Sequence, residues 1–462
     1  MQPDLSLPEN LMMNAWVQTE PATASPSSAV KSWLLGNTPQ KIRTFLKAPA
    51  KADPRDWRDS RVGWGLVLPH NPSLPSDKWS TADDAPEPIQ TLVKDRGENG
   101  NPAPVLRYRP GTNRIGFLTR DGADLPVSQS AYGTSTAAVP RYLLLYGTPK
   151  EIPWEVQYSL NATRAVGRLS LTGAALENYI SALMKNWAGA AANPDAALVW
   201  ASDLGPSDIT SLMRRAIAEP VLAKLKSDTS VGPGTVYLDG SKPGEATAQK
   251  LVDHLLDKRP GFILTTSHGQ TGPLDNLEQM TAHLGLLVDS DRNLLQPSAL
   301  SNWKPSGAIW YAHACCSAGS DAKTLFDGLL EPNSLADRVL KGVAKVGAKV
   351  SPLPQALLGA SEPLRAFIGH VEPTFDWTLQ QSVTKQFTTD PICTALYDDM
   401  FQPSPVGLAM GSVYGTLGGI YADYDRFSRI LSQPNMLHRL LIARDVQSMV
   451  ILGDPTAMLP IK

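Results

Sequence analysis

The chain has 462 residues, a formal net charge of −2 and 19% charged residues. This near-neutral balance excludes bulk electrostatic binding to nucleic acid or to an anionic membrane, so we expect neither as a partner. Three cysteines in a chain of this length exclude a disulfide scaffold and indicate a reducing, cytoplasmic compartment.

Residues 1–140 form the first compositional region. They contain 17 of the 39 prolines in less than a third of the length. Their start lacks the basic residues and apolar run of a secretory signal, and no stretch of the chain reaches the ~18 apolar residues of a membrane span. We therefore expect a Pro-rich N-terminal module or pro-segment over residues 1–140.

From residue 141 onwards, short apolar runs alternate with helical periodicity. This alternation predicts an α/β fold with a mainly parallel sheet covered by helices on both faces. In such a sheet the catalytic or binding residues lie beyond the carboxyl ends of the strands. We divide this part into a first subdomain at 141–195 and a catalytic subdomain at 196–462. The predicted strands are 141–147, 196–202, 234–240, 261–269, 307–316, 364–372 and 448–454.

Helices are predicted between these strands. Their apolar spacing places them at 174–187, 207–226, 245–256, 321–346 and 426–446. The helix at 207–226 begins at a Ser cap with Asp208 in its first turn. Pro332 and Pro434 are expected to break or kink the last two helices.

Two predicted strand ends carry chemically reactive residues. The strand at 261–269 ends in His268 followed by Gly269, and the strand at 307–316 ends in Cys315 and Cys316. Neighbouring parallel strands lie about 4.8 Å apart, so an imidazole and a thiol at these ends can face one substrate. The His can take the thiol proton, and Gly269 can offer its N–H to an oxyanion.

A zinc site at these cysteines is a poor alternative. Adjacent residues on an extended strand point to opposite faces, and the third cysteine, Cys393, is distant in the sequence. A buried Cys or His alone is usually part of the core, but their occurrence together at two strand ends favours a catalytic pair.

These residues resemble the caspase-like clan of cysteine peptidases and, within it, the gingipain-type family. The resemblance rests on Ser267-His268-Gly269 and Cys316-Ser317-Ala318-Gly319, and it covers residues from about 140 to 462. Three further segments carry it: YLLLYGTPKEIP from Tyr142, AVGRLS from Ala165 and LGDP from Leu452. Thr148 stands where the family usually has Asp.

The resemblance also implies which cysteine is the nucleophile. The family places the nucleophile three residues before a Gly, and Cys316 stands at this distance from Gly319. Cys316 is therefore the predicted nucleophile, with His268 as the acid and base and Cys315 as the fallback.

The same resemblance implies an acidic residue that holds a P1 Arg or Lys, in the loop after the first strand of the catalytic subdomain. The matching loop contains Asp203 and Asp208, of which Asp203 is the slightly better candidate. A turn or helix-cap role explains either residue about equally well. Phe375 or Trp377 is expected to stack on the P1 side chain.

The sequence therefore predicts a caspase-fold cysteine endopeptidase that cleaves protein or peptide substrates after Arg or Lys. Two alternatives remain: a catalytically silent caspase-fold binding or scaffold protein, and a peptidase with a different P1 preference. No organic cofactor or catalytic metal is implied, although relatives can carry structural calcium. We expect a restrained zymogen with an activating protease or regulatory protein, and Arg292 and Lys304 are candidate self-cleavage points.

Overall fold

The computed structural model describes residues 52–98, 100–110, 115–381, 383–429 and 433–460, and the backbone of two short strands, β1 (Leu11–Trp16) and β2 (Pro21–Ala24). The remainder of residues 1–51 lies outside the described residues, and with it the part of the predicted pro-segment that falls there. No helix of the described residues is long and apolar enough to cross a membrane.

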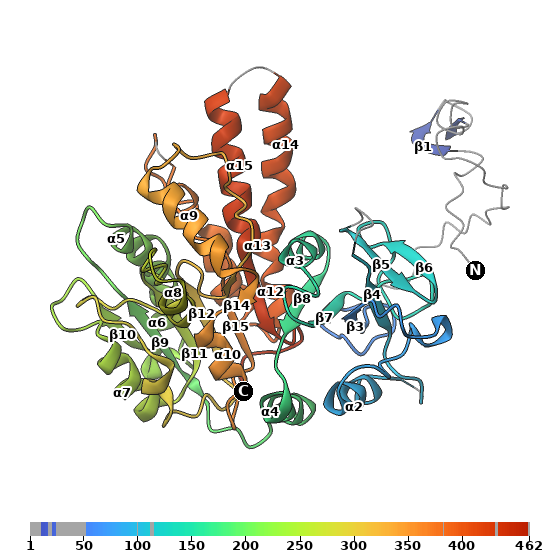
Figure 1. Cartoon of the computed structure of the whole chain (residues 1–462), viewed down its shortest axis with the longest axis horizontal. Helices are drawn as coiled ribbons and strands as arrows, with labels where there is room; N and C mark the ends of the chain where they lie inside the picture. The colour runs from blue at the N-terminus through green and yellow to red at the C-terminus, as the bar shows by residue number, and fades with distance from the viewer. Residues whose placement is uncertain are drawn as a thin grey trace.

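One twelve-stranded sheet runs through the molecule, and helices flank it as the alternating sequence pattern predicts (Figure 1). Its spatial order is β10-β9-β11-β12-β15-β16-β8-β7-β3-β4-β5-β6. The strands are β3 (Trp64–Pro69), β4 (Val105–Tyr108), β5 (Phe117–Arg120), β6 (Ala123–Pro126), β7 (Tyr142–Tyr146), β8 (Ala165–Leu169), β9 (Asn193–Ala201), β10 (Val236–Asp239), β11 (Pro260–Thr266), β12 (Ile309–His313), β15 (Ala366–His370) and β16 (Met449–Gly453). Two further short strands, β13 (Gly319–Ser320) and β14 (Lys349–Val350), pair with each other.

The predicted boundary at residue 140 does not separate two structural units. β3 pairs in parallel with both β4 and β7, and β7 pairs in parallel with β8. The antiparallel hairpin β5–β6 extends the same sheet. Residues 64–126 therefore belong with the subdomain predicted to begin at 141, because their short apolar runs supply four of its strands.

The remaining strands form the half of the sheet that carries the predicted catalytic residues. β9 pairs in parallel with β10 and β11, β11 with β12, and β12 with β15. β16 is antiparallel to β15 and also pairs with β8, so it joins the two halves. Thr266 lies opposite His313, which brings the ends of β11 and β12 to the same edge.

Hydrophobic cores cover both faces of this half. Val199, Leu264 and Tyr311 face one cluster, whereas their chain neighbours Trp200, Ile263 and Trp310 face the other. The first cluster is completed by α5 (Ile209–Met213), the π-helical turn η2 (Arg214–Ala218), α6 (Glu219–Ser227), α11 (Asp390–Cys393), α12 (Val406–Ala409) and α13 (Gly411–Tyr414). The second is completed by α4 (Gly173–Met184), α7 (Ala248–Lys258) and α10 (Pro352–Leu358). The alternation of strand residues therefore builds a buried sheet.

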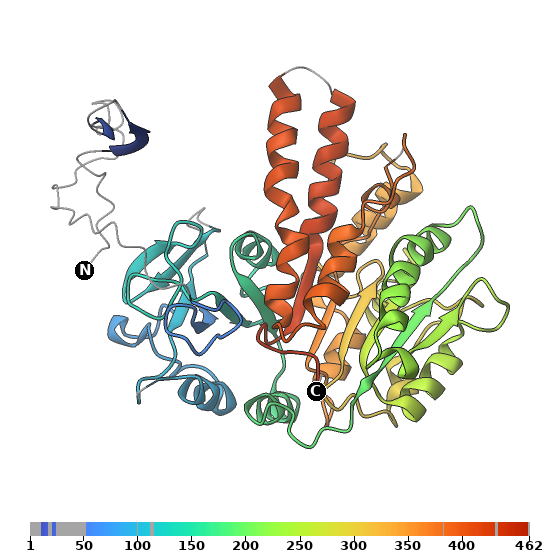
Figure 2. The same cartoon turned by 180° about the vertical axis from the view of Figure 1, so that it is seen from behind.

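Two predicted helices differ from the structure. The helix expected at 321–346 is α9, and it covers only Leu335–Val346, because the segment around Pro332 forms turns. The region 426–446 belongs to two helices, α14 (Thr416–Arg429) and α15 (Gln433–Ser448), so the break expected near Pro434 is present, although α14 begins ten residues earlier than predicted. Figures 1 and 2 show these two helices side by side as a hairpin that projects beyond the sheet. The other helices are α2 (Glu87–Asp95), α3 (Trp154–Asn161) and α8 (Leu277–His283).

Candidate active site

The ends of β11 and β12 bring the predicted His and Cys segments into contact. The Ser267 N–H donates a 3.2 Å hydrogen bond to the carbonyl oxygen of His313, so the backbone segments that continue β11 and β12 stay paired at the strand ends. His268 follows β11 with its side chain 36% exposed. Cys315 follows β12 and is half-buried. A histidine and a half-buried cysteine therefore follow neighbouring parallel strands at one edge of the sheet.

Gly269 allows this close approach. A Cβ atom at position 269 would lie 1.9 Å from the carbonyl oxygen of Cys315, far inside any tolerated contact. The Gly269 N–H also interacts with the Cys315 thiol. The glycine after the histidine is thus required by the backbone of the cysteine segment rather than by its own dihedral angles.

The structure corrects the choice between the two cysteines. Cys316 is fully buried in a cluster with Met280, Leu284 and Val343, where a substrate has no access. Cys315 instead accepts a 3.3 Å hydrogen bond from the Thr374 N–H on the segment after β15. The thiol at the sheet edge that carries His268 is therefore that of Cys315 and not that of Cys316. Cys315 is the alternative nucleophile that the sequence offers.

The backbone of Cys316 explains why the motif spacing misleads. Its φ is +54°, a left-handed conformation that is costly for a residue with a side chain. The chain reverses there, so alternation along the strand no longer applies. The Cys316 carbonyl is held by the Ser351 hydroxyl at 2.6 Å, and its N–H donates to the carbonyl oxygen of Glu372. Cys316 is a turn residue with a buried side chain.

Burial sets the resting state of both thiols. It raises the pKa of Cys315, while the Thr374 and Gly269 N–H groups act in the opposite direction. Burial holds the pKa of Cys316 well above its ordinary value. Cys315 is therefore a protonated thiol at neutral pH and needs a base before it can attack a carbonyl.

Asp208 is the partner of His268. Its Oδ2 lies 3.0 Å from His268 Nε2, while its Oδ1 caps helix α5 by accepting hydrogen bonds from the N–H and hydroxyl of Thr210. Burial acts to raise the pKa of Asp208, but the hydrogen bonds from Thr210 and His268 lower it overall. Asp208 is thus ionised at neutral pH and fixes the orientation of the imidazole.

The two carboxylates predicted to hold a P1 cation both have other partners. Asp208 is engaged by His268 and Thr210. Asp203 is 8% exposed and pairs with Arg214 Nε at 2.8 Å, and it also accepts the Gly205 N–H. Neither is free to receive a substrate guanidinium, which argues against both predicted roles.

Phe375 and Trp377 lie on the segment after β15, as expected, but they contact each other. Their rings stack with centroids 4.4 Å apart, and Phe375 also meets Phe326 edge to face. Both pack against the hydrophobic cluster of Phe326, Leu340 and Leu441. Their packing therefore needs no substrate, and stacking on a P1 side chain stays a prediction.

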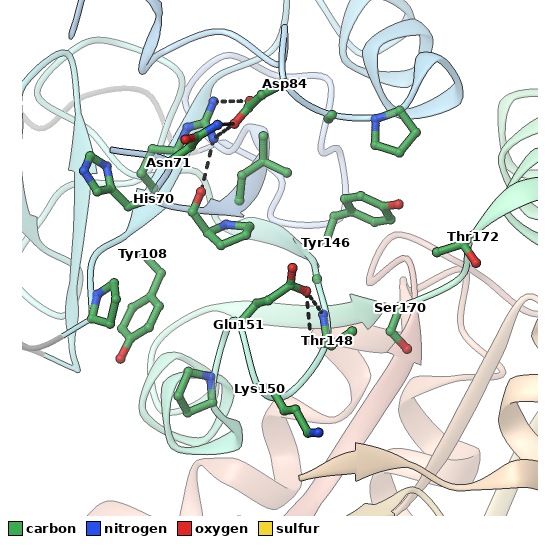
Figure 3. A pocket seen from close by; sticks show the side chains of 18 of the residues that line it. His70, Asn71, Asp84, Tyr108, Tyr146, Thr148, Lys150, Glu151, Ser170 and Thr172 are labelled. Atoms are coloured by element: carbon green, nitrogen blue, oxygen red, sulfur yellow. Dashed lines mark hydrogen bonds and ion pairs between the residues drawn. The ribbon is translucent and has the colours of Figure 1, made fainter. Parts of the chain in front are cut away.

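A separate cleft of about 730 Å³ lies at the carboxyl ends of β3, β4, β7 and β8. Part of the segment Tyr142–Pro153, which carries the family resemblance, lines it. Figure 3 shows Glu151 turned back toward Thr148, whose N–H and hydroxyl it accepts at 2.8 Å. The lining residues include His70 but no cysteine, so this cleft lacks the thiol of the β11–β12 edge.

No group of three or more His, Cys, Asp or Glu among the described residues is arranged to hold a metal ion. Comparison of the chain with protein-family models, with curated proteins and with solved structures finds no match.

Proposed function

We propose that the chain is a caspase-like, gingipain-type cysteine endopeptidase in which Cys315 is the nucleophile and His268 is the acid and base. The observation that carries the proposal is the placement of His268 and the half-buried Cys315 at neighbouring strand ends, with Asp208 3.0 Å from Nε2 of the imidazole. A nucleophile, a base and a group that orients the base are the parts that covalent catalysis requires.

The reaction begins with proton transfer from the Cys315 thiol to His268. The thiolate sulfur attacks the carbonyl carbon of the scissile peptide bond, and a C–S bond forms as the carbonyl electrons move to oxygen. The tetrahedral intermediate collapses, the C–N bond breaks, and His268 gives its proton to the leaving amine. Water activated by His268 then hydrolyses the thioester and restores the thiol.

The oxyanion is stabilised by backbone donors at the same edge. The Gly269 N–H already faces the thiol. The Cys315 N–H has no hydrogen-bond acceptor within the described part of the chain. Backbone N–H groups of this kind are the donors that an oxyanion hole uses, and Asp208 supports the imidazolium that forms meanwhile.

The substrate class follows from the resemblance. We infer protein or peptide substrates with a basic P1 residue, and a regulated enzyme in the cytoplasm that an activating protease or a regulatory protein controls. Structural calcium belongs to the same set of proposals, and the chemistry above uses none.

The test is thiol-dependent cleavage of a peptide mixture that varies at P1. Wild type should cleave, Cys315→Ala should not, and Cys393→Ala should match wild type, because Cys393 is buried 78 residues further along the chain. Cleavage that persists in Cys315→Ala would overturn the assignment of the nucleophile. No cleavage by folded wild type, at any P1, would favour the silent scaffold protein instead.

A further inference from the structure

The segment that follows β15 lies against the Cys315 thiol. Thr374, which is buried, donates its N–H to Cys315 Sγ at 3.3 Å, and its carbonyl and hydroxyl oxygens each lie 4.0 Å from the same sulfur. An N–H donor stabilises a thiolate more than a thiol, because it interacts most strongly with the charged form. The position of this one amide therefore affects how readily the thiol loses its proton.

Asp445 holds this segment from the side of α15. Its Oδ2 accepts a 3.2 Å hydrogen bond from the Phe375 N–H, the amide next to that of Thr374, and a 2.7 Å hydrogen bond from the Thr378 hydroxyl. Among the described residues, Cys315 and Asp445 are the only hydrogen-bond partners that residues 373–377 have outside the turn at 373–380. The anchor of the segment is thus one carboxylate.

The register of the sheet explains why Asp445 reaches this segment. Asp445 is four residues before Met449, the first residue of β16, and Met449 pairs with His370, the last residue of β15. The Val371 N–H then donates to the carbonyl oxygen of Ser448 at 3.0 Å. The end of α15 is therefore fixed beside the start of the segment, and a side chain one helical turn earlier can bond the residues that follow.

Burial makes this carboxyl group costly for the fold. Asp445 is 1% exposed, its Oδ1 has no hydrogen-bond partner, and His370 Nδ1 lies 3.8 Å from that oxygen. Hydrogen bonds return only part of the free energy that is lost when such a group leaves water. Since the hydrogen bonds of this side chain within the described residues go to the segment beside the thiol, its role concerns the position of that segment.

We propose that Asp445 is a positioning residue for the Cys315 thiol. By fixing the Phe375 amide, its Oδ2 keeps the adjacent Thr374 N–H directed at the sulfur, where this donor favours the thiolate that attacks the substrate. The catalytic consequence rests on the proposed peptidase function, whereas the contacts themselves involve no substrate. Asp445 acts on the sulfur through Thr374 and Phe375 rather than by a hydrogen bond of its own.

The charge of Asp445 acts on the thiol in the opposite direction. Burial is the main reason why the pKa of Cys315 is raised; the Thr374 N–H lowers it, and a negative Asp445 raises it further. Asn at position 445 keeps an acceptor oxygen but lacks the charge, whereas Ala lacks both. The two substitutions therefore separate positioning of the amide from a direct charge effect, which would change the thiol alike in both variants.

The other ionisable groups that line the cavity beside Asp445 do not obscure this comparison. They are His313, His370 and Arg439. Burial lowers the pKa of both histidines, so they are neutral near pH 7. Arg439 Nε lies 3.5 Å from Asp423, and both side chains are more than a third exposed, so this cation is partly neutralised and screened.

The experiment measures the pH dependence of iodoacetamide alkylation at Cys315, quantified by mass spectrometry of the modified peptide. In Asp445→Ala the segment loses its anchor, so we expect the pKa of Cys315 to rise by about one unit, with alkylation about tenfold slower below that pKa. Asp445→Asn should stay within about half a unit of wild type or fall below it. The matched control Asp376→Ala removes an exposed carboxylate from the same segment and should change nothing.

Melting curves verify that each variant is folded. If Asp445→Ala does not fold, Asp445→Leu takes its place, because it also lacks the acceptor and the adjacent cavity of about 170 Å³ has room for its methyl groups. An unchanged pKa of Cys315 in the folded Ala or Leu variant overturns the proposal. So does a shift that is the same with Asn as with Ala or Leu, since the acceptor oxygen then plays no part.

Peptide hydrolysis separates this inference from the proposed function. If wild type cleaves peptides, Asp445→Ala should lower kcat roughly tenfold with little change in KM, and Asp445→Asn should restore most of it. If no peptide is cleaved, the alkylation profiles still decide the role of Asp445. Active wild type with the same alkylation profile in all variants shows that the positioning role is wrong and leaves the peptidase proposal standing.

Discussion

His268 Nε2 lies 3.0 Å from Asp208 Oδ2, although 60 residues separate the two in the chain. The contact is made because Asp208 caps helix α5, which follows β9, and β9 is the neighbour of β11 in the sheet. One carboxylate therefore fixes a helix start and an imidazole at once, and the first prediction concerns this double role.

Replacing Asp208 by Asn should lower kcat by roughly 10²- to 10⁴-fold with little change in KM, because the imidazolium loses its anionic partner. Asn is also a good N-cap, so the fold should be retained. Asp203→Asn is the matched comparison: it breaks the partly buried pair with Arg214, which should cost about 1–3 kcal/mol of stability while kcat is kept. Steady-state kinetics and melting curves measure both. Equal kcat in the two variants would contradict the role of Asp208.

The two cysteines should respond in opposite ways to alanine. Cys315→Ala should abolish hydrolysis because the attacking sulfur is gone. Cys316→Ala should keep most of the activity and lose about 1–2 kcal/mol of stability, since it removes a buried sulfur from the cluster with Met280 and Leu284. Alkylation by iodoacetamide under native conditions, mapped by mass spectrometry, should modify Cys315 first. Preferential labelling of Cys316 in folded protein would contradict this.

Gly269→Ala should separate the two strand ends. Because the added methyl group meets the Cys315 carbonyl at 1.9 Å, the segments must move apart, and we expect a loss of about 2–4 kcal/mol in stability and of at least about 100-fold in kcat/KM. Gly418→Ala is the control, since a Cβ there meets no atom within 4 Å in helix α14 and should stabilise the helix slightly. If Gly269→Ala has full activity, the contact is not required.

Stability should depend on pH through Asp445. Burial raises its pKa to about 7, so the folded state keeps a proton that the unfolded chain has released by pH 5. The stability contributed by the neutral carboxyl is complete below about pH 4 and is lost as pH rises through 7. His313, whose pKa burial lowers to about 4, and His370, whose pKa is lowered well below its ordinary value, stay neutral in this window.

Asp445→Asn cannot ionise, so its Tm should rise relative to wild type between pH 5 and pH 8. Glu372, whose pKa burial raises to about 7, titrates in the same window but is common to both proteins. Melting curves at one-unit pH steps measure the difference. A Tm difference that is constant across this range would show that Asp445 does not titrate there.

Self-cleavage, if it accompanies activation, should occur after Arg292 rather than after Lys304. Arg292 is exposed in a turn between Val288 and Leu294, whereas Lys304 pairs with Glu362. Intact-mass analysis over time should therefore reveal one cut in wild type and none in Cys315→Ala. Full activity of a chain that stays uncleaved, with no partner added, would contradict the zymogen proposal.

The sequence predicts the strands that carry the site because their apolar runs are long and end in small or polar residues. β12 lies within the predicted range 307–316, β11 begins one residue before the predicted range 261–269, and the two strands are neighbours in the sheet. The first-half strands β3 to β6 are missed as members of the sheet, since each has only four to six residues between proline-rich loops. The proline-rich composition of this region indicates loops more strongly than it indicates strands.

The roles of the site residues could not be predicted from the sequence for a different reason. Asp208 is recognisable as a residue of the first helical turn, but its partner belongs to another strand. The motif spacing favours Cys316, because spacing carries no information on the positive φ that turns its side chain inward. Asp445 lies in helix α15, where the sequence pattern favours a surface carboxylate, and only the structure shows that it is buried. Each role depends on a tertiary contact that the local pattern does not encode.

The position of β16 has a consequence for how the chain folds. It is the last strand of the described residues in chain order, yet it stands in the interior of the sheet, between β15 and β8. Asp454, which follows it, accepts the indole N–H of Trp64 at a sequence separation of 390 residues. The two halves of the sheet therefore cannot pair through β16 until residues 449–453 have been synthesised. Such non-local closure is slow and leaves strand edges exposed in the meantime, so we expect a late folding step that unites two partly formed halves.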